Sequence, residues 1–472
     1  MEKFFRLKEH GTDVRTEVMA GLTTFMAMAY ILMVNANMFA NPFSDGTDVL
    51  GVSYGAIYIA TAISAIIGTV LVGLLANLPL AMASGMGLNA FFVYTVCVGM
   101  GFTYANALLF VLLDGIVFLL LSITGMLDKI FDAIPKAVRQ AIPAAIGLYI
   151  AFIGMQNAGI IVNNDSTLVS LASFNVFAGS VTSSQLMSMG ITFIGLLVIA
   201  VFSQKNIKGA VIWGIVISTI VYYLAGFAID GFYDGFFDNM SFDPIAAFRS
   251  FGSEAVGVVL TQGFDFSGYL QTHSTTDLVV VLITTSLAFC LVDMFDTLGT
   301  LFGACARGNM LTEDGKVPHM DKAMFSDAVA TCTGALLGTS TVTTFLESAA
   351  GVGEGGRTGL ASMVTGALFF VAMFLSPVAQ LIPTYATAAA LIYVGVLMMN
   401  CVRDIEWTDI TVAVPAFLTI ALMSFAYNIS YGIGIGIISY TLIAVCTGKT
   451  KEIKPLTWVI CILFAVMFLS TH

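Results

Sequence analysis

Charged residues are scarce in this sequence. Asp, Glu, Lys and Arg make up 10% of the 472 residues and hydrophobic residues make up 58%, whereas a soluble protein carries about 25% charged residues. A chain of this composition cannot bury its apolar surface in a water-soluble fold. Runs of about 20 apolar residues, each long enough to cross the hydrocarbon core as a helix, follow one another almost end to end. The composition therefore excludes the soluble classes and predicts a multi-pass membrane protein.

The sequence also lacks the residue patterns of metal, redox and catalytic centres. Its seven cysteines are scattered without a C-x-x-C pair, which is typical of small buried hydrophobic side chains. The four histidines, at positions 10, 273, 319 and 472, fall in tails or loops. No Ser–His–Asp arrangement accompanies the intramembrane acids, so we expect no metal, no cofactor, no enzyme activity and no nucleic-acid partner. The N-terminal stretch "MEKFFRLKEHGTDVRTEV" lacks the apolar centre of a secretory signal peptide.

Apolar runs separated by polar breaks predict an all-α polytopic protein with fourteen transmembrane segments. If the N-terminus is cytoplasmic and the segments alternate in direction, every lysine and arginine except Arg249 falls on the cytoplasmic side, in accord with the positive-inside rule. We therefore expect a protein of the cell membrane with a cytoplasmic N-terminus. The expected segments lie near residues 17–40, 54–76, 80–100, 105–126, 138–156, 186–203, 208–227, 280–303, 324–339, 340–354, 358–376, 384–401, 410–426 and 430–447.

An acidic and aromatic external loop divides the chain into two halves. Each half holds seven segments, and an odd number forces the halves to insert in opposite orientations, which is the inverted-repeat arrangement of many secondary transporters. The short apolar stretch at 455–469 could lie on the cytoplasmic face, pack beside the bundle or cross; we favour a helix at the interface. The expected regions are a cytoplasmic N-terminus (1–16), a first inverted repeat (17–227), an acidic extracellular loop (228–279), a second inverted repeat (280–447) and a C-terminal tail with a short apolar helix (448–472).

Glycines and β-branched residues interrupt the third and tenth segments. "PLAMASGMGLNAFFVYT" carries Gly85, Gly87 and Asn89, and "TSTVTTFLESAAGVGEGG" carries Gly351 within a G-x-G-x-x-G pattern. A dinucleotide loop would need a preceding strand and a βαβ repeat in water, whereas both neighbours here are membrane segments. The β-branched run at 339–345 instead favours a short extended piece before a short helix. Unwound backbone at this depth is tolerated only where it is buried in protein or lines a cavity, so the stretch indicates a substrate site.

Carboxylates within the apolar segments point to the chemistry of that site. In "SLAFCLVDMFDTLGTLFG", Asp293 and Asp296 lie three residues apart on one helical face, and Thr300 follows one turn later. Glu347 lies where the extended piece meets the short helix, a position favoured by a helix N-terminus and open to a simple capping role. Asp114 is a further intramembrane acid, without a partner evident from the sequence. Because such acids are costly and usually face a cavity or a polar partner, we expect Asp293 and Glu347 to bind a polar solute and to carry a proton.

Five motifs together resemble one transporter family over nearly the whole chain. They are "GTDVRTEVMAGLTTFMAMAYILMVN", "GMGLNAFF", "VDMFDTLGT", "ESAAGVGEGGRTGL" and "VAVPAFLTI", and they are similar to the AzgA-like adenine/guanine/hypoxanthine permeases of the nucleobase–cation symporter-2 group. The resemblance implies fourteen spans in two inverted repeats, a core and a gate domain, a homodimer, and purine nucleobase uptake driven by H⁺. It implies functional positions at Asn89, Asp293 and Glu347. The full expected set is Asn89, Asp293, Glu347, Phe345 and Ser348 for the substrate, Asp293 and Glu347 for the proton, and Asp296, Thr300, Gly85, Gly87 and Gly351 in support.

Our interpretation is a lipid-embedded permease that imports adenine, guanine or hypoxanthine by H⁺ symport and alternating access. Phe25, Tyr30 or Phe345 could stack on the base, and the sequence does not select among them. A carrier of uracil, xanthine or an inorganic anion on the same fold stays open as an alternative, although an anion carrier should place basic or neutral groups beside its helix ends. An ion channel would need a continuous polar pore, and a membrane enzyme would need a nucleophile–base pair or a metal set.

Overall fold

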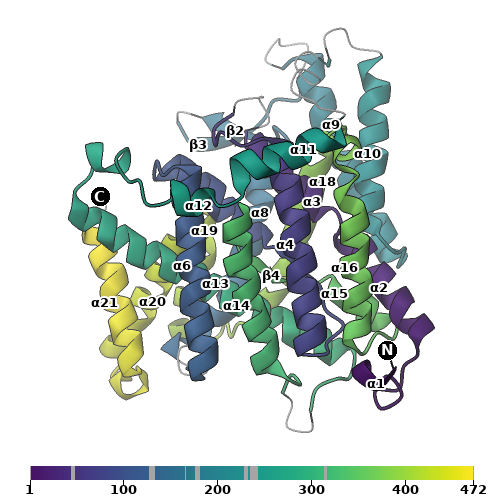
Figure 1. The fold of residues 1–472 in the computed structure, drawn as a ribbon. Coiled ribbons are helices and arrows are strands. Elements are labelled where there is room, and N and C mark those ends of the chain that lie inside the picture. The colour runs from purple at the N-terminus through teal and green to yellow at the C-terminus, as the bar shows by residue number, and fades with distance from the viewer. Residues whose placement is uncertain are drawn as a thin grey trace.

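Helices make up nearly all of the regular structure in the computed structural model (Figure 1). The structure describes residues 2–43, 48–126, 133–164, 166–175, 181–227, 232–233, 243–312 and 316–470. Eight of the described helical stretches are long and apolar enough to cross a membrane, and five further apolar helices are shorter. The predicted multi-pass helical architecture is confirmed, and the count of fourteen spans stays a prediction.

The helices follow the predicted apolar runs closely. The eight long stretches are α2 with α3 (Val14–Met28 and Ile31–Ala40), α4 (Tyr54–Leu75), α6 (Tyr104–Thr124), α8 (Lys136–Asn157), α9 (Ser183–Gln204), α13 (Thr275–Arg307), α18 with the 3₁₀ turn η5 (Thr384–Met398 and Met399–Asp404) and α20 (Ile429–Cys446). Further helices are α5 with the π-helix η1 (Met86–Ala90 and Phe91–Gly99), α10 (Ala210–Gly226), α14 (Met320–Leu337), α15 (Ser348–Gly353), α16 (Gly359–Met373), α19 (Ile410–Phe425) and α21 (Pro455–Ser470).

Polar side chains at the helix starts fix where two of the long helices begin. Thr103 accepts a hydrogen bond from the backbone N–H of Asn106 at the start of α6, and Ser274 accepts one from Asp277 at the start of α13. In both pairs the second side chain bonds back to the backbone of the first residue. Such capping boxes satisfy N–H groups that have no partner within the helix, so these helices begin where the sequence turns from polar to apolar.

Two parts of the chain differ from the prediction. The expected external loop at 228–279 contains α11 (Pro244–Ser250), α12 (Val258–Thr261) and the first turn of α13, so it is partly helical; its residues 228–231 and 234–242 lie outside the described residues. A hairpin of β2 (Ile161–Asn164) and β3 (Leu168–Leu171), between α8 and α9, is also absent from the prediction. An external loop can hold short helices, so the assignment of 228–279 as a loop outside the membrane stays a prediction, whereas the hairpin is an element that polar composition alone does not reveal.

Two three-residue strands cross in the middle of the bundle. β1 (Met82–Ser84) pairs antiparallel with β4 (Val342–Thr344), with Ala83 opposite Thr343, and Figure 1 labels β4 among the central helices. A Cβ atom on Gly85 would lie 2.7 Å from Thr343 Cγ2, so only glycine allows this crossing. Each strand is followed by a short helix, α5 or α15. The predicted extended pieces in the third and tenth segments are therefore confirmed.

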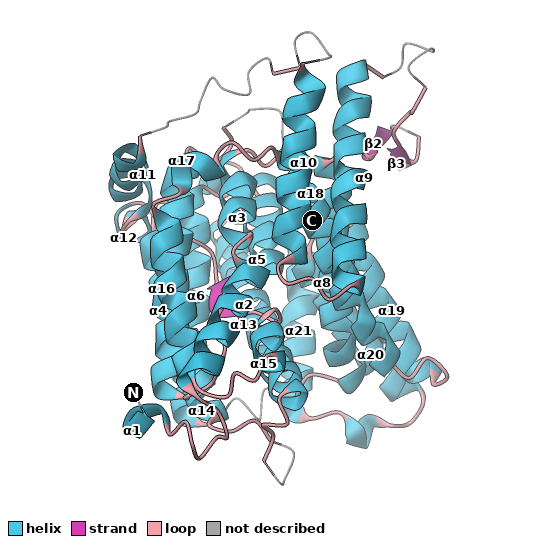
Figure 2. Ribbon diagram, turned by 90° about the vertical axis from the view of Figure 1, so that its right-hand side faces the viewer, coloured by secondary structure: helices cyan, strands magenta, loops and turns pink. Residues whose placement is uncertain are grey.

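The helices pack as two groups that contact each other less than they contact their own members. The first helix group comprises α2–α6 and α13–α16, and the second comprises α8–α10 and α18–α20. In Figure 2 the first group lies mainly to the left and centre and the second to the right. α13 touches α8 and α20, and α5 touches α8, so these helices form the boundary between the groups.

The C-terminal helix α21 packs along α20. Phe464 is fully buried and lies against Gly434 of α20, and the ring of Phe468 packs against that of Tyr431 nearer the start of α20. The two helices therefore run antiparallel, and α21 also contacts α13. The apolar face of α21 thus covers α20 and α13, so the helix packs beside the bundle, and its position relative to the membrane interface stays a prediction.

Candidate functional site

Glu347 lies at the boundary between the two helix groups, where Tyr30 holds it. The Tyr30 hydroxyl donates to Glu347 Oε1 at 2.6 Å, and Glu347 keeps some exposed surface. Glu347 directly precedes α15, but its side chain makes no capping bond to that helix, so the simple capping role is not used. Tyr393 of α18, in the second group, lies within electrostatic range of Tyr30. The carboxylate is thus placed where both groups meet.

Asp296 is the α13 carboxylate that faces this same boundary. It is partly exposed, and it is close enough to Glu347 for the two charges to interact. Cys401 of η5, on the second group, lies within electrostatic range of Asp296, and Thr300 is buried one turn further along α13. Asp296, which the sequence analysis gives a supporting role, therefore lies at the boundary together with Glu347.

Asp293 lies inside the first helix group. It has no exposed surface, and its Oδ2 accepts a hydrogen bond from Thr331 of α14 at 3.1 Å. Asp114 of α6 and Asp327 of α14, which are also fully buried, interact with it electrostatically. These three aspartates form the buried acid cluster. Direct contact between Asp293 and a substrate would require the cluster to open, whereas Asp296 and Glu347 already reach the boundary.

Hydrogen bonds satisfy the buried acid cluster only in part. Thr297 donates to Asp327 Oδ2 at 2.8 Å and lies 2.6 Å from the Thr343 hydroxyl of β4. Within the described part of the chain, Asp293 Oδ1, Asp327 Oδ1 and both carboxylate oxygens of Asp114 have no hydrogen-bond partner. None of the ion pairs between described residues includes these acids. Because an ionised carboxylate without a partner is costly to bury, the cluster is suited to hold protons.

Asn89, Phe345 and Ser348 lie around the β1–β4 crossing. Asn89 is fully buried, its Nδ2 donates to the carbonyl of Ser84 at a long 3.5 Å, and its Oδ1 has no partner among the described residues. Ser348 Oγ accepts a hydrogen bond from the backbone N–H of Ala81 at 3.0 Å, and the Phe345 ring is buried. Asn89 therefore offers an unused acceptor, whereas Ser348 is occupied in fixing β1.

The supporting glycines allow the short helices to approach their neighbours. A Cβ atom on Gly87 of α5 would lie 2.4 Å from Ile146 Cγ2 of α8, across the boundary between the groups. A Cβ atom on Gly351 of α15 would lie 2.1 Å from Thr24 Oγ1 of α2. Both contacts are too short for any side chain, so these positions set the spacing of the helices around the site.

Two of the residues described above were not predicted in the positions that they take. Tyr30 was considered only as a stacking ring, yet its hydroxyl is the hydrogen-bond donor to Glu347. Asp327 was overlooked because it lies near the start of its apolar segment. The only available signal for Asp327 was a carboxylate within an apolar helix, a pattern that already marked Asp114 and Asp293.

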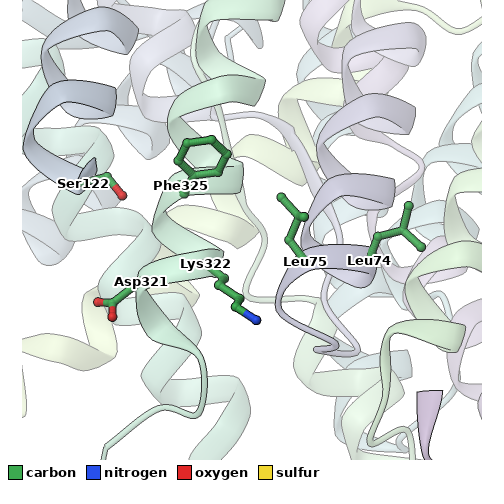
Figure 3. A pocket seen from close by; sticks show the side chains of 6 residues that line it. All are labelled: Leu74, Leu75, Ser122, Asp321, Lys322 and Phe325. Carbon is green, nitrogen blue, oxygen red and sulfur yellow. The ribbon is translucent and has the colours of Figure 1, made fainter. Parts of the chain in front are cut away.

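A surface pocket lies apart from these carboxylates. Figure 3 shows the side chains from α4, α6 and α14 that line it: Leu74, Leu75, Ser122, Asp321, Lys322 and Phe325. None of the predicted substrate residues belongs to this lining. The pocket therefore has no part in the site at the boundary.

The paired strands and the short helices that follow them, in the middle of a bundle of apolar helices, define the class of protein, a multi-helix membrane protein. The transmembrane domain of a cyanobacterium bicarbonate transporter, BicA, has the same fold with a TM-score of 0.60 at 13% identity, covering 89% of this chain and 97% of that one. The murine anion transporter Slc26a9 in its inward-facing state gives a TM-score of 0.59 at 11% identity, over 92% of this chain and 68% of that one. At these identities the likeness shows the fold alone.

The chain belongs to the xanthine/uracil permease family, whose sequence profile matches residues 15–435. Adenine permease AdeP of Escherichia coli (strain K12) is 36% identical over 474 residues, covering 100% of this chain and 97% of AdeP. Guanine/hypoxanthine permease PbuG of Bacillus subtilis (strain 168) is 36% identical over 470 residues, covering 99% of each chain. The protein is therefore a multi-pass membrane transporter related to the nucleobase permeases, and it is not an enzyme. The family resemblance seen in the motifs is confirmed.

Proposed function

We propose that the protein imports purine nucleobases, adenine or guanine and hypoxanthine, by H⁺ symport and alternating access. One observation carries the proposal. Asp296 and Glu347 form a pair of partly exposed carboxylates at the boundary of the helix groups, in a chain that aligns end to end with an adenine permease and a guanine/hypoxanthine permease.

The chemistry of a neutral purine fits this pair. The edge of the base presents ring N–H donors beside N or O acceptors, and charge-assisted hydrogen bonds to a carboxylate are roughly twice as strong as neutral ones. Glu347 and Asp296 take the donors, and Asn89 uses its free Oδ1 to orient the ligand or the third segment. Phe345 lies two residues before Glu347 and offers a buried apolar ring. Asp293 does not contact the base; it takes part in transport through the proton that the buried acid cluster holds.

The packing supports an inverted-repeat transporter. The first helix group contains the expected segments 1–4 and 8–11, and the second contains segments 5–7 and 12–14, so each half of the chain contributes the same relative members to both groups. We propose that the first group is the core and the second the gate, that their relative movement exposes the site to either side, and that the N-terminus is cytoplasmic. A homodimer in the cell membrane completes the proposal.

Carriers of other solutes are less compatible with the boundary. An inorganic anion would be repelled by two carboxylates, since juxtaposed like charges cost several kcal/mol. Uracil and xanthine also offer N–H donors, and uptake competition separates them from the purines proposed here.

The deciding experiment is uptake of radiolabelled adenine, guanine and hypoxanthine by cells that lack their own carriers. We expect saturable uptake that unlabelled purines inhibit, that uracil and phosphate do not inhibit, and that a protonophore abolishes. Asp296→Asn and Glu347→Gln should each reduce uptake at least about 100-fold, equivalent to about 2.7 kcal/mol, while the protein still reaches the membrane.

Asp321→Asn is the matched control, because Asp321 is exposed and lines only the surface pocket. It should transport like the unmodified protein. Normal uptake by the Asp296 and Glu347 variants would overturn the site assignment, and uptake that persists without a pH gradient would overturn the symport.

A further inference from the structure

Asp114 belongs to the buried acid cluster but has no role in the function proposed above. It sits in the middle of α6 with no exposed surface, and neither of its carboxylate oxygens has a hydrogen-bond partner among the described residues. Its polar neighbours are the thiol of Cys290 on α13 and the hydroxyl of Thr341 beside β4. The Thr341 hydroxyl is itself fully buried and unpartnered within the described chain. The Cys290 thiol and the Thr341 hydroxyl lie within hydrogen-bonding influence of Asp114, but neither completes a bond of good geometry with it, so this buried carboxyl group has no strong partner among the described residues.

The groups around Asp114 favour a carboxyl group that holds a proton. The titratable groups that face it are Cys290 and Asp293 on α13 and Asp327 and Cys332 on α14, and η1 and α12, which also pack against α6, carry no charged residue. Carboxylates that share a site without a cation cannot all be ionised, so at least one retains a proton. Among the described residues, no group of three or more His, Cys, Asp or Glu side chains is arranged to hold a metal ion.

A line of side chains connects Asp114 with the substrate carboxylates. Cys290, Asp293 and Asp296 follow one another at three-residue intervals on α13, which places them along one side of the helix. Cys290 faces Asp114, Asp293 belongs to the buried acid cluster, and Asp296 faces Glu347. A change of protonation at Asp114 therefore changes the electrostatic surroundings of Asp293 and, through it, of the pair that meets the substrate.

We propose that Asp114 shares the coupling proton with Asp293 and does so without touching the substrate. This inference rests on the proposed proton-coupled function. The step moves one proton from a carboxyl O–H of one aspartate to a carboxylate oxygen of the other, so the total charge of the pair is conserved. Asp114 is therefore a proton-holding residue for the coupling and has no part in substrate binding.

The test compares purified wild-type protein with Asp114→Asn and Asp321→Asn in proteoliposomes, with radiolabelled hypoxanthine and adenine as probes. Asp114→Asn should bind these bases and exchange them across the membrane within about twofold of the wild-type rate. It should lose at least tenfold of the accumulation that an imposed pH gradient drives, and the remaining transport should no longer vary with pH. Asp321→Asn should retain the wild-type pH profile.

Two results would overturn the inference. One is pH-driven accumulation by Asp114→Asn at the wild-type level. The other is a folded Asp114→Asn protein, with unchanged Tm, that neither binds nor exchanges purines, because Asp114 would then act in substrate binding. If wild-type protein itself takes up no purine, the proposed function fails and the variants are not needed to show it.

A second variant decides the question if Asp114→Asn does not assemble. Thr341→Val keeps the shape of the side chain and removes the hydroxyl that faces Asp114. It should displace the pH at which uptake is half-maximal while exchange at the optimum stays near the wild-type rate. An unchanged pH profile in folded Thr341→Val would overturn the inference.

Discussion

Glu17 and Asp114 are both carboxylates with no exposed surface, but their surroundings differ completely. Glu17 of α2 accepts two backbone hydrogen bonds, from the N–H of Arg357 at 2.8 Å on Oε1 and from the N–H of Ala361 at 3.1 Å on Oε2. These amides lie just before and within the first turn of α16, where a negative charge is favoured by the helix dipole. Asp114 has only the Thr341 hydroxyl and the Cys290 thiol as hydrogen-bonding neighbours, and neither forms a bond of good geometry with it.

The comparison distinguishes a buried carboxylate that stabilises the fold, Glu17, from one that lowers its stability, Asp114. Glu17 joins α2 to α16 and satisfies N–H groups that a helix start leaves unpaired. Asp114 contributes no such bond, so its burial lowers the stability that an apolar residue would give. A protein keeps an uncompensated acid at this depth where it has a function, and the same reasoning applies to Asp293 Oδ1 and Asp327 Oδ1.

The largest expected effect is on stability, from Glu17→Ala. This substitution leaves the N–H of Arg357 without an acceptor, which costs about 1–3 kcal/mol. It also removes the charge-assisted bond from the Ala361 N–H, worth about 1.5–3 kcal/mol, and leaves that N–H only its 3.2 Å bond to the carbonyl of Thr358. We expect a loss of roughly 2–6 kcal/mol, seen as a clearly lower Tm in detergent and weaker expression in the membrane. Glu17→Gln retains one acceptor oxygen and should lose less. A wild-type Tm for Glu17→Ala would show that water replaces the carboxylate, and the contrast with Asp114 would disappear.

The opposite behaviour is expected of Asp293→Asn. The amide has nearly the shape of the carboxyl, and it removes a charge that has a single hydrogen bond from Thr331, so Tm should be unchanged or higher. Purine uptake should fall about 100-fold, or about 2.7 kcal/mol, because the variant can no longer exchange a proton. Uptake is measured beside Tm on the same preparation. A lower Tm with normal uptake would place Asp293 with Glu17 as a structural group.

The sequence was sufficient for features that depend on local chemistry. The apolar runs identified the helices, and the β-branched run around Val342 identified the extended piece that became β4. Carboxylates within apolar segments marked the candidate site, because burial of such groups is costly wherever the helix packs. Each of these inferences depends on a single stretch of chain.

Features that depend on how helices face one another were beyond the sequence. Asp293 and Asp296 are only about 60° apart around α13, and packing against α14 decides that the first points inward while the second meets Glu347. The bond between Tyr30 and Glu347 joins residues 317 positions apart. No pattern within one segment predicts such a contact, and the same holds for Glu17 and α16.

A moderate effect is expected of Tyr30→Phe. The variant removes the hydroxyl that donates to Glu347 Oε1 at 2.6 Å and leaves the ring in place. Hydrogen bonds to charged groups contribute about 1.5–3 kcal/mol, part of which water replaces, so the KM for purine uptake should rise about tenfold with little change in kcat. Concentration-dependent initial rates measure both. A lower KM would mean that Tyr30 competes with the base for the carboxylate.

The smallest effect is expected at an exposed ion pair, which differs from both buried carboxylates. Lys208 precedes α10 in the second helix group, and its Nζ lies 2.8 Å from Oε2 of Glu354, at the end of α15 in the first group. The two side chains are 42% and 38% exposed. Exposed pairs contribute about 0–1 kcal/mol, and salt screens them. Lys208→Ala should therefore change uptake no more than about twofold, with a larger change at low ionic strength.

Lys208→Glu adds repulsion to the same contact, and the double variant Lys208→Glu/Glu354→Lys should return uptake to the wild-type rate. A loss of uptake above tenfold in Lys208→Ala would show that this pair, although exposed, controls the movement of the two helix groups, and burial would then no longer distinguish the functional charges of this protein from the others.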